Sequence, residues 1–177
     1  MKYSIIIIIS LMLFSCSKTE EKQEEVIEYD INTIEKNGVN LEAVCQCKLK
    51  GLNKDTIYFS FYIQDDNGYN TDGISLVDVP FDKSRVSLNQ FHPTNVGNPS
   101  ILYFHLIGDD AIDGIYNLIE VDSNWIEITD IDICAQKVTG DFQATFLLEE
   151  DLGGSGLPDT VMITSSGFEV GFCNACP

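Results

Sequence analysis

Five cysteines in the body of the chain are the residues whose type and spacing could most directly carry chemistry. Cys45 and Cys47 form a Cys-x-Cys pair, Cys173 and Cys176 form a Cys-x-x-Cys pair, and Cys134 stands alone between them. Two such pairs supply four soft ligands of the kind that bind Zn²⁺ or Cu(I). A Cys-x-x-Cys pair is also found in thiol-redox centres, although those usually begin a helix.

Disulfides are the simpler expectation for these cysteines, because an exported protein meets an oxidising environment. Cys45 and Cys47 lie two apart on one face of a predicted strand, which is a poor geometry for bonding each other. We therefore expect one or two disulfides between this strand and the tail that carries Cys173 and Cys176. Since five is an odd number, at least one cysteine remains free or pairs outside the chain.

An acidic turn offers a second chemistry, the binding of Ca²⁺ by oxygen ligands. Asp109, Asp113 and Glu120 match three positions of a helical calcium loop. Position 3 of that loop is Ala111, however, and residues 115–119 alternate like a strand. We therefore expect an acidic turn here and keep the three residues as calcium candidates.

The remaining candidates for chemistry are scattered. His92 and His105 are the only histidines, and His105 is expected to pack or to face solvent within a strand. No Ser-His-Asp or other catalytic constellation is recognisable, so we expect no enzyme. A platform of aromatic rings could bind sugars, although strands favour aromatic residues in any case. Its members would be Trp125, Tyr58, Tyr62, Tyr69 and Tyr103.

The N-terminus predicts export and a lipid anchor. Lys2 precedes a short apolar run from Ile5 to Phe14, which suits a secretory signal but is too short to cross a bilayer. The run ends in Leu13-Phe14-Ser15-Cys16, which resembles a bacterial lipobox. That resemblance implies cleavage after residue 15, a diacylglycerol on the sulfur of Cys16 and an acyl chain on its new amine. Several acyl chains anchor a protein firmly in a lipid bilayer.

Residues 16–36 are assigned to the lipidated cysteine and an acidic tether. Residues 17–25 contain no apolar side chain and cannot form a core. A lysine followed by acidic residues also resembles the surface-export signal of Bacteroidetes-type lipoproteins, here interrupted by Thr19. We expect the outer membrane with the domain facing the cell exterior, and the periplasmic leaflet is the alternative.

The charge of the chain limits its partners. The 28 acidic residues outnumber the 10 basic ones, which gives a formal net charge of −18 at pH 7. A polyanion is repelled by phosphate backbones, so nucleic-acid binding is excluded.

The elements that must position these residues are strands. In the stretch from Val138 to Leu148, apolar residues occupy every second position and polar ones occupy nearly all of the others. This period of two is typical of a strand with one buried face. Residues 41–49 and 57–63 predict a hairpin, residues 101–107 predict a central strand, and Thr129 is the expected place of a bulge.

The whole pattern predicts an all-β domain over residues 37–177. We expect about nine strands in an antiparallel β-sandwich or partly closed barrel, with no helix inside it. Residues 26–38 are ambiguous, because isoleucines at helical spacing precede Asn37-Gly38, a pair that could end a helix.

A resemblance to a family appears in the second half of the chain. Four motifs follow in order, Gly114-Ile-Tyr116-Asn-Leu118, Ile126-Glu-Ile128-Thr-Asp130, Val138-Thr-Gly140-Asp-Phe142 and Ile163-Thr-Ser-Ser-Gly167-Phe168-Glu-Val170. The series resembles an uncharacterised family of small Bacteroidetes-type lipoproteins, in which a Gly-x-Phe strand precedes a Gly-Phe-x-Val closing strand. The resemblance implies a β domain on a lipid tether, and no activity.

Three functions remain open. The leading hypothesis is a membrane-anchored, surface-exposed lipoprotein whose non-catalytic β domain binds a protein or glycan partner or has a structural role. The first alternative is a thiolate metal-binding or thiol-redox lipoprotein, with Zn or Cu as the metal. The second is an accessory protein in glycan binding or degradation. The sequence does not determine the oligomeric state.

Overall fold

The computed structural model describes residues 30–50, 55–94, 97–107, 111–119 and 122–172. These residues form eleven strands and no helix, which confirms the all-β class. The count exceeds the expected nine because the ambiguous segment before residue 37 is a strand and because the residues from Arg85 to Gln90 form two short strands in place of one. The strands are β1 (Asp30–Lys36), β2 (Val39–Lys50), β3 (Thr56–Gln64), β4 (Asn70–Pro80), β5 (Arg85–Ser87), β6 (Asn89–Gln90), β7 (Ser100–Ile107), β8 (Ala111–Leu118), β9 (Trp125–Asp132), β10 (Lys137–Asp151) and β11 (Thr160–Gly171).

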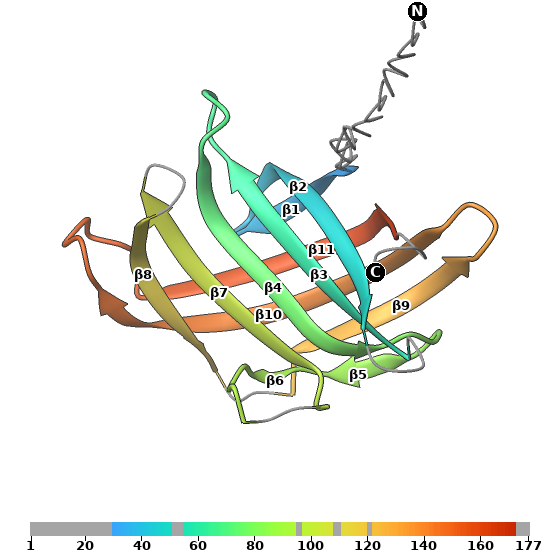
Figure 1. Cartoon of the computed structure of the whole chain (residues 1–177). Coiled ribbons are helices and arrows are strands. Elements are labelled where there is room, and N and C mark those ends of the chain that lie inside the picture. Colours follow the sequence, from blue (N-terminus) through green and yellow to red (C-terminus); the bar gives the residue numbers. More distant parts are fainter. Residues whose placement is uncertain (1–29, 51–54, 95–96, 108–110, 120–121, 173–177) are drawn as a thin grey trace, which may run out of the picture.

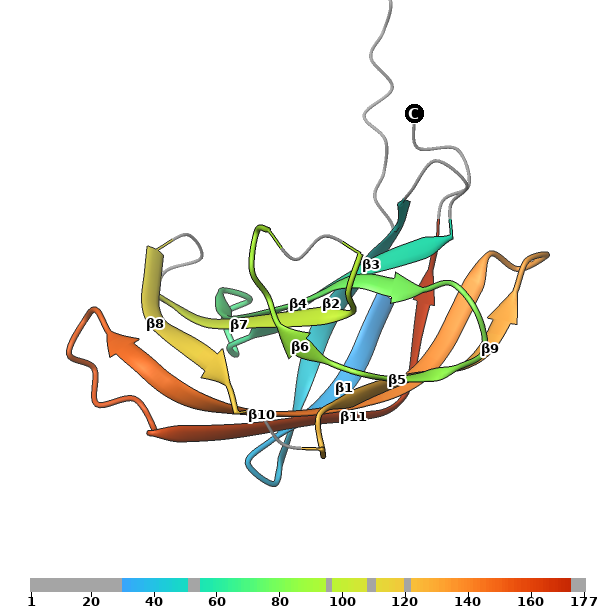
Figure 2. The ribbon, with the colours of Figure 1, turned by 90° about the horizontal axis from the view of Figure 1, so that it is seen from below.

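The strands form one sheet that partly closes on itself. Its order is β11-β1-β2-β3-β4-β7-β8-β10-β9-β5, and the short β6 pairs with β7. Strand β10 closes the ring, because one of its edges pairs with β11 while β8 and β9 share the other. In Figure 1, β3, β4 and β7 cross in front of β10 and β11, and Figure 2 shows the same strands as two layers. The arrangement is therefore a partly closed barrel.

Strand β10 is the stretch in which the alternation was most regular, and the structure confirms the alternation. Its inward residues are buried, whereas Leu147 on the outer face is 50% exposed. The buried ones are Val138, Gly140, Phe142, Ala144 and Phe146. The predicted bulge is also present, because pairing passes from Thr139–Asp130 to Gly140–Ile128 and leaves Thr129 without a partner in the ladder.

The ambiguous N-terminal segment is a strand. Strand β1 pairs with β2 through a two-residue turn at Asn37 and Gly38, whose φ angles are 51° and 81°. Both angles are positive, as an Asn-Gly hairpin turn requires, so this pair connects two strands and does not end a helix. The sheet consequently begins before residue 37, and Asp30–Lys36 belongs to the domain and not to the tether.

The other strand predictions hold with small extensions. Strands β2 and β3 form the expected hairpin, with Ala43 opposite Ile63 and Leu49 opposite Ile57. Strand β7 is central, since it pairs with β4 on one edge and with β8 on the other.

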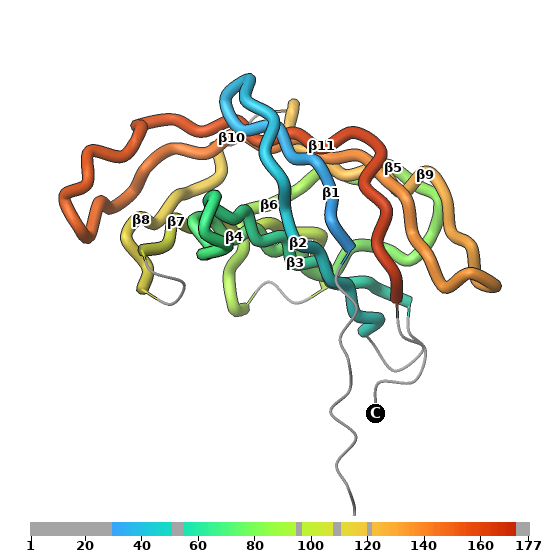
Figure 3. The backbone as a smooth tube through the Cα atoms, turned by 90° about the horizontal axis from the view of Figure 1, so that it is seen from above, coloured from blue at the N-terminus to red at the C-terminus, as the bar shows by residue number. Residues whose placement is uncertain are grey.

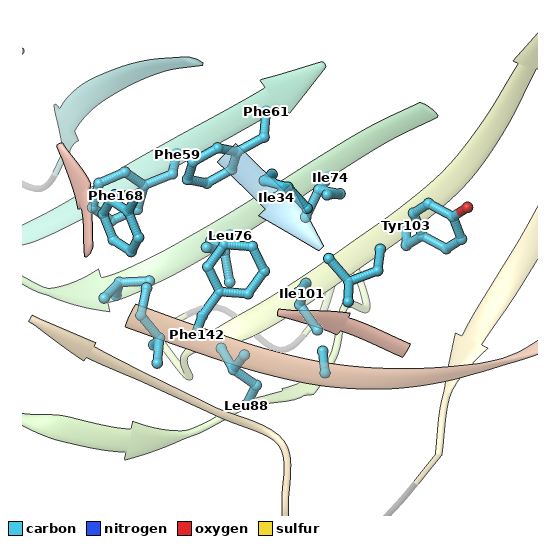
Figure 4. Close-up of a cluster of buried hydrophobic side chains, with 14 of the residues drawn as sticks. Ile34, Phe59, Phe61, Ile74, Leu76, Leu88, Ile101, Tyr103, Phe142 and Phe168 are labelled. Carbon is cyan, nitrogen blue, oxygen red and sulfur yellow. The ribbon is translucent and has the colours of Figure 1, made fainter. Parts of the chain in front are cut away.

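The apolar interior is richest in aromatic rings at one end. Phe59, Phe61, Phe142 and Phe168 are each almost fully buried, with ring centroids 5.3 Å apart for Phe59–Phe168 and 5.4 Å apart for Phe61–Phe142. We call these four residues the phenylalanine cluster. In Figure 4, Tyr103 lies at the far side of the drawn core, and its hydroxyl points away from that cluster.

Candidate functional site

The other end of the interior holds a buried group of polar side chains. Asp72 on β4 and His105 on β7 are directly opposite in the ladder, and residues so paired point to the same face of a sheet. Tyr103 lies two residues before His105 on β7, and Lys36 is the last residue of β1. We call Lys36, Asp72, Tyr103 and His105 the polar cluster.

Asp72 is the centre of the polar cluster. Its carboxylate Oδ1 accepts hydrogen bonds from Lys36 Nζ at 2.7 Å and Tyr103 Oη at 2.6 Å, and lies 3.1 Å from His105 Nδ1. Thr71 Oγ1 donates to Oδ2 at 3.2 Å. Burial alone would raise the pKa of Asp72, but the hydrogen bonds from His105, Lys36 and Tyr103 and the charge of Lys36 lower it to about 2. Asp72 is therefore a buried, fully bonded carboxylate.

Tyr103 contributes a neutral donor. Burial, followed by the negative charge of Asp72 and the bond to it, raises the pKa of Tyr103 far above the usual range. The Lys36 ammonium also lies 5.8 Å from the centre of the Tyr103 ring, on whose face a cation is favoured.

Lys36 and His105 retain hydrogen-bonding capacity that the described part of the chain does not use. Their side chains are 19% and 20% exposed, whereas that of Asp72 is 3% exposed. An ammonium has three N–H groups, and among the described residues only Asp72 accepts one of them. His105 uses Nδ1 toward Asp72, and its Nε2 has no bond within the part of the chain that the structure describes. The arrangement can therefore offer Lys36 N–H groups and one imidazole nitrogen to a ligand.

The motifs of the sequence did not predict this cluster, although the sequence contains a signal for it. His105 was expected to pack or face solvent, and Asp72 was not connected to it. Lys36 lies two residues after the buried Ile34, and Asp72 lies two residues before the buried Ile74. Each polar residue is therefore on the inward face of its strand. A charged residue at core parity is unusual and marks a buried polar site, because buried charges need partners.

The calcium candidates are only partly described. Asp109 and Glu120 lie outside the described residues. Asp113 on β8 is 2% exposed, and both of its carboxylate oxygens are buried without a hydrogen-bond partner among the residues described. Within the same residues, no three His, Cys, Asp or Glu side chains converge as metal ligands do.

The three described cysteines do not form one site. Cys45 is fully buried, Cys47 is partly buried on the same face of β2, and Cys134 is exposed in the turn between β9 and β10. Burial raises the pKa of both Cys45 and Cys47 to about 12, so neither forms a thiolate readily. Cys16, Cys173 and Cys176 lie outside the described residues.

The aromatic residues expected as a sugar platform are also dispersed. Tyr103 is buried inside the ring, and Trp125 on β9 is covered by the Arg85 guanidinium at 3.7 Å. Tyr58 and Tyr62 share the outer face of β3, where Tyr58 hydrogen-bonds Ser60 and Ser75. The five rings therefore do not form a common surface.

His92 lies at a separate, open hollow of about 650 Å³ beside the loop that precedes β7. Lys50, Asp78 and Phe91 also line it. His92 Nδ1 lies 2.8 Å from Thr94 Oγ1, a contact within its own loop. This hollow lacks the convergent buried polar groups of the polar cluster.

Comparison with known protein families, with curated proteins and with solved structures found no match to this chain.

Among the described residues, no helix has the length and apolar character needed to span a bilayer.

Proposed function

We propose that this protein is a lipid-anchored binding protein, held at Cys16 in the outer membrane and presenting a non-catalytic β domain to the cell exterior. The observation that carries the binding role is the unused hydrogen-bonding capacity of Lys36 and His105 beside the buried Asp72. Specific ligand sites commonly combine a rigid apolar scaffold with a few such convergent polar groups. A ligand with oxygen acceptors fits the Lys36 N–H groups. His105 donates from Nδ1 to Asp72, so its Nε2 is an acceptor when the ring is neutral and fits a hydroxyl of the same ligand.

The position of the cluster along β1 supports this proposal. The described chain begins at Asp30, and Lys36 stands at the opposite end of the same strand. Seven residues of strand span about 20 Å. The polar cluster therefore lies at the end of the domain away from the side on which the tether would attach, where a partner can approach.

The chemistry of the cluster favours binding over catalysis. His105 hydrogen-bonds no hydroxyl or thiol among the described residues, whereas nucleophilic catalysis needs one within reach of its base. Tyr103 is held neutral, and Asp72 already accepts four hydrogen bonds.

The two histidines allow a sharp test of binding. The imidazole signals of His105 and His92 can be followed separately by NMR while oligosaccharides and small carboxylates or phosphates are added to the protein. We expect a ligand to shift the His105 signals and to lose at least tenfold in affinity in His105→Gln. His92→Gln is the matched control and keeps full affinity. Ligands that shift only His92, or turnover of a glycan or ester substrate, would contradict the proposal.

The anchor is tested separately. Cells grown with an alkyne-labelled fatty acid should label the wild-type chain and Cys134→Ser, but not Cys16→Ser, because the acyl groups are attached at residue 16. Added protease should degrade the domain on intact cells if it faces outward. Protection until the outer membrane is opened would favour the periplasmic leaflet.

For the cysteines, we propose a disulfide between Cys47 and the tail. Strand β2 meets the end of the described chain at a parallel bridge between Cys47 and Phe172, and Cys47 Sγ lies 3.0 Å from Gly171 O. Cys173 follows next in the sequence. Peptide mapping of unreduced protein should recover Cys47 linked to Cys173 or Cys176. A native mass spectrum with bound Zn or Cu would instead favour the metal-binding alternative.

A further inference from the structure

The connection between β10 and β11 folds back onto the start of β8. Leu152 N donates to Asp113 O at 2.7 Å, and Tyr116 Oη donates to Pro158 O at 3.2 Å. The side chain of Leu157 lies against Gly114. Seen from above in Figure 3, the β10–β11 connection lies beside β8 at one end of the molecule. This loop, residues 152–159, therefore covers the first half of β8.

The loop has a fixed shape that places the Ser155 hydroxyl near Asp113. The Asp151 carboxylate accepts hydrogen bonds from Ser155 N at 3.1 Å and Gly156 N at 3.2 Å. Gly153 lies directly on the Asp113 carboxylate, and a Cβ there would overlap Oδ1 of Asp113 while lying 3.2 Å from Ser155 Oγ. The carboxylate and this hydroxyl therefore face the same point.

The Asp113 carboxylate lacks the partner that its burial requires. It is 2% exposed, and neither oxygen has a hydrogen bond or ion pair within the described residues. The nearby charges are also negative, because Asp151, Asp113 and Asp159 all act on Tyr116 and, after burial and Asp72, help to raise its pKa. A buried carboxylate without a compensating charge is costly, and more so beside other carboxylates.

We propose that this loop and Asp113 form a Ca²⁺ site. The carboxylate of Asp113 and the hydroxyl of Ser155 are hard oxygen ligands, and carbonyl groups of the glycine-rich loop and water complete the shell. Ca²⁺ accepts six to eight oxygen ligands in irregular geometry, whereas Mg²⁺ demands a nearly regular octahedron. The ion supplies the positive charge that the buried carboxylate lacks. This site differs from a helical calcium loop, because its ligands come from strand β8 and from the β10–β11 connection about 40 residues later.

The test compares the purified full chain in detergent, after treatment with a chelator, with and without added CaCl₂ at about 0.15 M salt. The salt screens loose attraction of Ca²⁺ to the acidic surface. We expect one Ca²⁺ per chain by calorimetry and a midpoint of thermal unfolding raised by about 5–10 °C at saturation. MgCl₂ should give a clearly smaller shift.

Two variants with the same charge change separate the site from the general acidity of the chain. Asp113→Asn should abolish the Ca²⁺-dependent shift, while Asp66→Asn, in an exposed turn, should retain it. Ser155→Ala should weaken Ca²⁺ binding severalfold. Without Ca²⁺, Asp113→Asn should unfold no earlier than the wild type, because it removes an unpaired buried charge. The proposal is wrong if the wild type shows no shift, if Asp113→Asn shifts equally, or if that variant is already destabilised in the chelated state.

Discussion

The two ends of the sheet interior bury different kinds of side chain and stabilise them in different ways. At one end, four phenylalanine rings pack against one another and need no hydrogen bonds. At the other end, β1, β4 and β7 bury a carboxylate and must surround it with donors, from Lys36, Tyr103 and His105. The packed rings stabilise the fold without needing any partner group. The buried carboxylate lowers the stability of the fold strongly if one of its hydrogen-bond partners is lost. A protein that keeps the second arrangement retains polar groups that can serve recognition.

The largest effect is expected at the phenylalanine cluster. Phe142→Ala should lower the free energy of unfolding by about 3–5 kcal/mol, because it removes a buried ring and leaves a cavity. Leu147→Ala, on the outer face of the same strand and 50% exposed, should change it by less than about 1 kcal/mol. Urea unfolding measures both, and similar losses for the two would contradict the assigned faces of β10.

A somewhat smaller effect is expected at the polar cluster. Asp72→Asn should lower the free energy of unfolding by about 3 kcal/mol, because it leaves the partly buried Lys36 ammonium without its counter-ion. Adding Lys36→Met to Asp72→Asn should recover part of the loss, so the two substitutions will not be additive in a double-mutant cycle. Additive losses would show that the two charges do not interact.

The pH dependence of stability separates the two ends further. The pKa of Asp72 is about 2 in the folded chain against an ordinary value of 3.8. Its ionised form therefore contributes stability that is present above about pH 4 and is lost as the pH falls toward 2. The contribution is about 2 kcal/mol, and Asp72→Asn should lack it. Chemical unfolding between pH 5 and 2 should show the wild type and this variant converging, and parallel curves would contradict the assignment.

The smallest effect concerns thiol reactivity at the apolar end. In reduced protein at pH 8, Cys134 should react with iodoacetamide rapidly, because it is exposed. Cys45 and Cys47 should react slowly until the chain unfolds, because burial raises their pKa to about 12. Mass spectrometry of timed samples locates the label. Equal rates of alkylation for Cys47 and Cys134 would favour the thiol-based alternative function.

Much of the fold was predictable because alternation along a strand is a local property. The inward face of β10, the β2–β3 hairpin and the bulge at Thr129 all follow from which side chains lie two apart. The segment before Asn37 was not predictable in the same way. Its isoleucines fit a helix or a strand, and only pairing with β2 and β11 decides between them.

The polar cluster could not be predicted from the sequence alone, for a different reason. Lys36, Asp72 and His105 are about 30 residues or more apart and belong to no motif. Each sits at core parity beside apolar neighbours, which indicates burial but does not identify a partner. For Asp113, the sequence pointed to a local loop, while the tertiary structure places it under a connection about 40 residues later.

The sequence by itself determined the class of fold, the buried face of the regularly alternating strands and the expectation of a lipid anchor, because these depend on neighbours in the chain. Only the tertiary structure decided that β10 closes the sheet into a partial ring, and that Lys36 and His105 meet at Asp72. The physical reason is that a buried charge is tolerated only where partners converge on it, and such convergence depends on strand order.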